Sequence, residues 1–166
     1  MKVHSFLVGC LLLAGISLSA QSLPPEIRQA SGSPFDAKGR TVEPVWKNAD
    51  VLTGFNEYRT NRRAPYQTRA RLLYDRDNLY FNIESIFDRR FEFVPPQKVS
   101  PFARTGIELF IQPDRNNGNF YHLAVAPGSD PYTADSFTEM PMKGLEVKIY
   151  KKNKMTRVFN LRIPLK

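Results

Sequence analysis

The sequence predicts an all-β protein, an antiparallel β-sandwich of the immunoglobulin-like or jelly-roll-like kind. Three observations support this fold class. Short runs in which apolar and polar residues alternate recur along the chain, as in strands that bury one face. Turn residues separate these runs at the spacing typical of sandwiches. No segment shows a long helical period, and the best helical candidate is a short turn around residues 45–51.

The predicted strands run from the middle of the chain to its end. They comprise residues 70–75, 78–85, 106–112, 119–126, 145–152 and 156–164. Asp77 and Asn78 are expected to form the turn between the first two strands, because both residue types favour turns. Asn117 and Gly118 predict a tight hairpin further along the chain, since this pair readily adopts positive φ angles.

The N-terminal 20 residues are expected to be a secretory signal. Lys2 precedes an apolar run over residues 6–16, and small residues follow up to Ala20. The apolar run is too short to span a bilayer, so a membrane anchor is not expected. We therefore expect export of the protein to the periplasm or the extracellular space.

The rest of the chain has the size of one domain. Residues 21–34 are rich in Pro, Ser and Gly and are expected to be a linker or an edge segment, and residues 35–166 a single domain with one core. Without Lys2, the mature chain keeps 23 of its 24 basic side chains against 16 acidic ones, a formal charge of +7. The only cysteine, Cys10, leaves with the signal, so no disulfide, thiolate nucleophile or Cys-ligated metal is expected.

Residues suited to catalysis or metal binding are few. His122 is the only histidine besides His4, and no acidic partner stands at a telling spacing from it, so neither a catalytic site nor a metal centre is predicted. Asp114, Asn116 and Asn119 have calcium-loop spacing, but no bidentate glutamate follows at the required distance. A plain hairpin is the preferred interpretation here, and calcium is the alternative.

The segment EYRTNRRAPYQTRAR, residues 57–71, interleaves arginines with Tyr58 and Tyr66. Such a pattern is able to bind phosphate backbones and bases. An exported protein rarely meets nucleic acid, so no nucleic-acid partner is expected. We connect the charge instead with anionic glycans, such as uronate or sulfated chains, or with an anionic membrane surface. The alternative is an ordinary solvated loop. The arginines are Arg59, Arg62, Arg63, Arg69 and Arg71.

Five motifs in order along the chain resemble the carbohydrate-binding module family 9-like domain. They are FDAKGRTVEPVWKNAD, TRARLLYDRDNLYFNIES, SPFARTGIELFIQPD, NFYHLAVAP and FNLRIP. Four of them are similar to the family's D-G-x-x-x-E-x-x-W-x-x-A opening, its T-x-V-x-x-L-Y-D-x-x-x-L-Y hairpin, its P-W-x-x-D-x-V-E-I-F-I strand and its late V-E-x-x-I-P strand. The resemblance extends from Phe35 to the end of the chain, and the β-sandwich that it implies agrees with the strand pattern.

The resemblance also implies a sugar site and its residues. In binding members, aromatic rings stack on the C–H face of a sugar while polar side chains bind its hydroxyl rim. Carried over by position, the platform ring is Phe102, the strand carboxylate is Glu108, and a polar position of the next strand is His122. Trp46 matches a position that packs in the core. Three side chains are expected to extend the polar face: Tyr80, Asn82 and Glu84.

The sequence thus favours an exported, non-catalytic carbohydrate-binding module without a cofactor, which supports glycan breakdown by glycoside hydrolases. One alternative is a structural or interaction module that binds no sugar. A second is a glycosidase, which would need Glu84 and Glu108 on neighbouring strands. A third is a haem-binding electron-transfer domain, with His122 and a methionine as axial ligands. The candidate methionines are Met140, Met142 and Met155.

Overall fold

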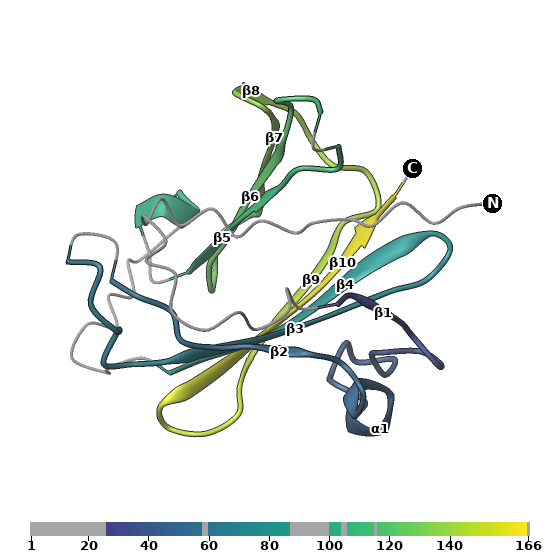
Figure 1. The fold of residues 1–166 in the computed structure, drawn as a ribbon, viewed down its shortest axis with the longest axis vertical. Coiled ribbons are helices and arrows are strands. Elements are labelled where there is room, and N and C mark those ends of the chain that lie inside the picture. Colours follow the sequence, from purple (N-terminus) through teal and green to yellow (C-terminus); the bar gives the residue numbers. More distant parts are fainter. Residues whose placement is uncertain (1–25, 58–59, 87–99, 104–105, 115, 166) are drawn as a thin grey trace. The chain divides into compact units, whose positions relative to one another are not determined.

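A computed structural model describes residues 26–57, 60–86, 100–103, 106–114 and 116–165. Within these ranges the chain is mostly β, with two sheets and one short α-helix (Figure 1). The expected signal over residues 1–20 lies outside the described residues. The described part contains no helix long and apolar enough to cross a membrane.

The chain divides into two compact units, each with its own sheet. Of the described residues, unit 1 contains 100–143, and unit 2 contains the segments before and after them, 26–86 and 144–165. The all-β fold class is confirmed. In the described part of the chain, every element is a strand except one short α-helix and a single 3₁₀ turn.

Unit 2 holds the six-stranded sheet, in the order β1-β3-β4-β10-β9 with β2 also paired to β3. All pairs are antiparallel except β1 with β3. The edge strand β1 lies in the segment expected to be a linker or an edge segment. The strand bounds are β1 Arg28–Gln29, β2 Val51–Leu52, β3 Thr68–Tyr74, β4 Asn78–Ile86, β9 Glu146–Lys151 and β10 Thr156–Pro164.

The alternation along these strands separates an apolar face from a polar one. Leu72, Phe81 and Leu161 occupy one row across β3, β4 and β10, and all three are buried. The next row carries Arg71, Asn82 and Asn160, because successive side chains point to opposite faces.

The segment around helix α1 (Glu43–Trp46) contributes a second core cluster to unit 2. Trp46, for which the sequence predicts a core position, is 1% exposed and its Nε1 donates to the Pro34 carbonyl at 2.9 Å. Phe35 contacts both Trp46 and Tyr80, with ring centroids 5.7 and 5.8 Å apart. Helix α1 begins at Glu43, two residues before the turn that was expected over residues 45–51. Pro44 lies in the first turn of this helix, where a proline favours helix initiation.

The turn between β3 and β4 is held by Asp75. Its Oδ1 accepts hydrogen bonds from the backbone N–H groups of Asp77 and Asn78, each at 2.8 Å, and its Oδ2 accepts one from Tyr80 Oη at 2.6 Å. Burial disfavours the charged carboxylate, but these hydrogen bonds outweigh it and lower the pKa of Asp75. Burial, together with the Asp75 hydrogen bond, raises the pKa of Tyr80 to about 12.

Unit 1 holds a four-stranded antiparallel sheet in the order β5-β6-β7-β8. Strands β5 and β6 fall within the predicted runs, whereas β7 and β8 were not predicted. A 3₁₀ turn, η2, precedes β5 and contacts β6. The bounds are η2 Pro101–Ala103, β5 Ile107–Ile111, β6 Tyr121–Val125, β7 Tyr132–Asp135 and β8 Thr138–Glu139.

The connection between β5 and β6 differs from the predicted tight hairpin. It runs over residues 112–120, and neither Asn117 nor Gly118 adopts a positive φ. Asp114 Oδ1 instead accepts a hydrogen bond from the backbone of Asn116, and Asn117 Oδ1 accepts one from Asn119, each at 2.9 Å. Side-chain-capped turns therefore replace the two-residue turn, because they shape a longer loop in which none of the described residues is left-handed.

Candidate functional site

Strand β5 presents a polar and aromatic face opposite its apolar face. Leu109 and Ile111 are buried, whereas Glu108 and Phe110 point to the other side of the sheet, since side chains alternate along a strand. The Glu108 side chain is 50% exposed. A carboxylate in the middle of an apolar strand is thus accommodated on a face that reaches solvent.

The strand register brings two more side chains onto this face. Phe110 lies directly opposite His122 of β6, and Ala124 lies opposite both Glu108 and Tyr132. Ala124 is 1% exposed, so a small residue fills the position between two larger ones. We call the surface formed by Phe102, Glu108, Phe110, His122 and Tyr132 the aromatic face.

Glu108 and His122 form the polar contact of the aromatic face. Glu108 Oε2 lies 3.2 Å from His122 Nε2, and the imidazole is the more buried partner at 16% exposure. An ionised carboxylate only accepts hydrogen bonds, so the contact requires a proton on Nε2. The imidazole is thereby oriented, while the half-exposed carboxylate remains accessible from solvent.

Aromatic rings surround this pair. The His122 ring stacks on Phe110, with centroids 4.3 Å apart and planes inclined by 14°. Phe102, from η2, lies 5.6 Å from His122 and 5.0 Å from Tyr132 between ring centroids. Although three rings lie within contact distance of the imidazole, Phe102 keeps 48% of its surface exposed. It is the most exposed of the three rings next to the polar pair.

The structure therefore brings together the three residues predicted for ligand binding, Phe102, Glu108 and His122. Phe110 and Tyr132 were not among the predicted ligand-binding residues. The alternation does place Phe110 on the strand face of Glu108, because the two are separated by two positions. Tyr132 has no such signal, since it lies on the four-residue strand β7, which is too short to show a clear alternation.

The expected extension by Tyr80, Asn82 and Glu84 is wrong for this sheet. These residues lie on β4 in the six-stranded sheet of unit 2, whereas β5 belongs to the four-stranded sheet of unit 1. For the same reason Glu84 and Glu108 are not on neighbouring strands, which was the condition for a two-carboxylate glycosidase. Glu84 Oε1 accepts a hydrogen bond from Lys152 Nζ at 2.8 Å.

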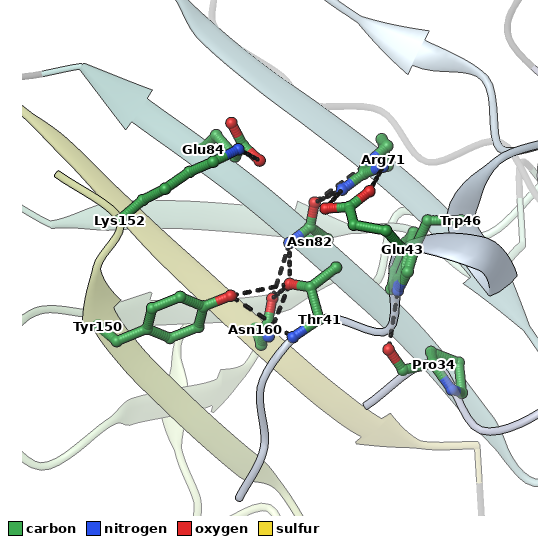
Figure 2. Close-up of polar contacts among 10 residues, drawn as sticks. All are labelled: Pro34, Thr41, Glu43, Trp46, Arg71, Asn82, Glu84, Tyr150, Lys152 and Asn160. Carbon is green, nitrogen blue, oxygen red and sulfur yellow. Dashed lines mark hydrogen bonds and ion pairs between the residues drawn. The ribbon is translucent and has the colours of Figure 1, made fainter. Parts of the chain in front are cut away.

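Asn82 is instead the centre of a buried polar network in unit 2 (Figure 2). Its Nδ2 donates to Asn160 Oδ1 at 2.8 Å and to Thr41 Oγ1 at 2.9 Å, and its Oδ1 accepts from Arg71 Nε at 2.9 Å. Asn160 Nδ2 donates to the Gly39 carbonyl at 2.9 Å. The network ties residues 39–41 to the central strands of the sheet.

Arg71 joins this network to helix α1. It forms a forked ion pair with Glu43 at 2.8 and 3.1 Å, and its guanidinium carbon lies 5.4 Å from the centroid of the Trp46 ring. The hydrogen bond from Arg71 is the main cause that lowers the pKa of Glu43. Because these polar groups bind one another, we interpret the network as a structural connection between the N-terminal segment and the sheet.

The remaining alternatives gain little from the geometry. The described residues contain no group of three or more His, Cys, Asp or Glu side chains placed to hold a metal ion. Asp114, from the calcium-loop alternative, caps its own turn through Oδ1. For the haem alternative, Met140 and Met142 lie in unit 1 with His122, Met155 lies in unit 2, and His122 Nε2 is directed at Glu108.

The charge of the chain is unevenly distributed. Residues 100–143 contain five acidic and three basic side chains, and the rest of the chain contains 11 acidic and 21 basic ones. The predicted arginine-rich segment belongs to unit 2, where Arg71 is paired with Glu43. Tyr58 and Arg59 lie outside the described residues. The basic surplus is therefore carried by segments other than the one that forms the aromatic face.

Comparison of the chain with protein-family models, with curated proteins and with solved structures finds no match.

Proposed function

We propose that the aromatic face binds carbohydrate, and that the protein is an exported, non-catalytic carbohydrate-binding module that supports glycan breakdown by glycoside hydrolases. The observation that carries this proposal is the position of the half-exposed Phe102 ring beside the Glu108–His122 pair. A sugar ring has an apolar C–H face and a polar hydroxyl rim, and this arrangement offers a partner for each.

Each residue has a distinct role in the proposed complex. Phe102 supplies the ring on which the sugar stacks, and Tyr132 supports it edge-on at 5.0 Å. Glu108 accepts hydrogen bonds from hydroxyl groups, which are stronger for an ionised acceptor than for a neutral one. His122 positions the Glu108 carboxylate, and Phe110 packs against the imidazole ring of His122. Binding then uses a preformed surface and forms no covalent bond.

We further propose that the two sheets belong to one β-sandwich. Each sheet has an apolar face that must be covered in water: Leu109 and Leu123 lie side by side in one sheet, and Phe81 and Leu161 in the other. Packing two such faces together is the usual way in which antiparallel sheets bury them.

The proposal is tested by screening the mature chain against neutral, acidic and sulfated polysaccharides, beside Phe102→Ala and Glu108→Ala. Met155→Ala and Glu26→Ala are matched controls, because they remove an exposed apolar and an exposed acidic side chain from unit 2. We expect wild type and both controls to bind the same glycans, and both site variants to lose binding while circular dichroism shows an intact fold.

Absence of binding by a folded wild-type protein would contradict the proposal and favour a structural or interaction module. Binding that survives both site substitutions would place the sugar elsewhere in the molecule. If both site variants lost binding of neutral glycans but still bound acidic ones, the acidic glycans would be bound by the arginine-rich segment of unit 2 instead.

A further inference from the structure

The aromatic face continues into a longer series of rings within unit 1. Phe110 lies 5.7 Å from Phe120, and Phe120 lies 5.4 Å from Phe137, measured between ring centroids. Together with the contacts already described, six rings form one uninterrupted chain of contacts, which we call the ring row. Its members are Tyr132, Phe102, His122, Phe110, Phe120 and Phe137.

The two most exposed rings of this row lie at opposite ends of strand β7. Phe102 contacts Tyr132, the first residue of β7, and Phe137 follows its last residue, Asp135, by two positions. The four residues of β7 span roughly 13 Å at about 3.3 Å per residue. One sugar ring is too small to contact both Phe102 and Phe137, whereas a chain of sugars is long enough.

Phe137 is held in an exposed position by the local backbone. Its side chain is 90% exposed, although burying a phenylalanine is normally favourable. The preceding Ser136 adopts a φ of 54°, and its N–H donates to the Phe120 carbonyl at 2.6 Å. The β7–β8 turn is thus fixed so that the Phe137 ring meets Phe120 edge-on and still faces solvent. Contiguous exposed apolar surface is typical of a binding site, and Phe137 is an exposed end of the ring row.

The charge near the ring row favours a neutral ligand. Glu108 lies on the aromatic face, and residues 100–143 carry more acidic than basic side chains. A uronate or sulfated chain in this place would meet the Glu108 carboxylate, and like charges repel.

We propose that the ring row binds an unbranched, neutral polysaccharide along its length, with several sugars in contact at once instead of a single terminal sugar. This inference rests on the proposed function and specifies its ligand class. Phe102 and Glu108 hold one sugar, and Phe137 stacks against another further along the same chain. The affinity therefore depends on ligand length.

The test is a calorimetric titration with neutral oligosaccharides of glucose, xylose and mannose, each from the monosaccharide to the hexasaccharide. We expect the affinity for the recognised series to rise with length and to level off once both exposed rings are covered. Phe137→Ala should weaken binding of the hexasaccharide about tenfold, the effect of losing one stacked ring, and leave the disaccharide unchanged. Phe102→Ala should weaken binding of both ligands.

Met140→Ala is the matched control, because it removes an exposed apolar side chain from the same unit but outside the ring row. Equal affinity for monosaccharide and hexasaccharide, or an unchanged hexasaccharide affinity in a folded Phe137→Ala variant, would overturn this inference and leave the proposed function standing. Tighter binding of oligogalacturonates of the same lengths would overturn the neutral ligand class. If no saccharide binds the wild type, the proposed function itself fails.

Discussion

Glu108 Oε2 lies 3.2 Å from His122 Nε2, although the two residues are 14 positions apart in the sequence. The contact is diagonal across the β5–β6 pair, because Phe110 is the residue directly opposite His122. It joins a half-exposed carboxylate to an imidazole held between aromatic rings. The polar pair and the ring row are therefore parts of one surface.

Glu108→Gln should weaken glycan binding while changing stability little. The amide is a poorer acceptor than the carboxylate, so we expect about a tenfold loss of affinity, within the range for charge-assisted hydrogen bonds. The Glu108 side chain is half-exposed and its amide replacement still reaches His122, so the free energy of unfolding should change by less than about 1 kcal/mol. Calorimetry measures the affinity, and urea denaturation measures the free energy of unfolding.

Glu26→Gln is the control for this prediction and should alter neither quantity. If a folded Glu108→Gln variant bound glycan with wild-type affinity, Glu108 would not belong to the site.

Asn82→Ala should destabilise the protein by about 2–3 kcal/mol, because it leaves buried partners without hydrogen bonds. Asn82 is 1% exposed and bonds to Thr41, Asn160 and Arg71. Asn116→Ala is the control, since this side chain is exposed and should change stability by less than about 0.5 kcal/mol. Urea denaturation compares the variants, and equal midpoints would contradict the structural role of the network.

Gly106→Ala should disrupt the four-stranded sheet. A Cβ atom at this position would lie 2.3 Å from the Val125 carbonyl oxygen, which belongs to the backbone of β6 and is not free to move alone. Gly118→Ala is the matched control, because a Cβ there meets no atom within 4 Å. We expect a large loss of stability for Gly106→Ala alone, measured by thermal unfolding. A similar melting temperature for both variants would show that the β5–β6 approach is looser than described.

Tyr80 should make the protein sensitive to alkaline pH. Its folded-state pKa is raised to about 12 from an ordinary value of 10.0, so the phenol stays protonated in the folded state after the unfolded chain has ionised. The stability that this difference contributes is present in full below pH 10 and is lost as the pH rises towards 12.

Tyr80→Phe tests this pH dependence. The variant loses the hydrogen bond to Asp75 and should be less stable than wild type at neutral pH. Between pH 10 and 12, however, its free energy of unfolding should fall less steeply, because the group that ionises has been removed. Denaturant titrations at several pH values measure how steeply the free energy of unfolding falls for each protein. Equal slopes for wild type and Tyr80→Phe would show that Tyr80 does not cause the pH dependence.

The sequence predicted the long strands well and the short ones poorly. Strands β3, β4 and β10 each span at least seven residues, so their alternation is visible against turn residues on either side. Strands β1, β2 and β8 have two residues each, which is too few for any periodic signal. Their pairing depends on neighbouring strands in space, and local sequence does not encode that.

The candidate site followed from the family resemblance, which proposed Phe102, Glu108 and His122 together. The strand pattern predicted only that Glu108 and His122 lie on strands. Asn82 looked like an outward polar residue of a strand, yet it is buried. The alternation assigns a face to a residue but does not say what covers that face. Residues 39–41 cover this face at Asn82, and their contacts with β4 and β10 join residues far apart in the sequence.

The most direct test of sugar binding at the aromatic face is an NMR measurement of intermolecular contacts between a bound neutral oligosaccharide and protein with labelled phenylalanine and tyrosine rings. We expect nuclear Overhauser effects from sugar C–H protons to the rings of Phe102 and Tyr132, and their loss in Phe102→Ala. A bound oligosaccharide that instead gives contacts only to rings of unit 2, such as Tyr150, would contradict this expectation.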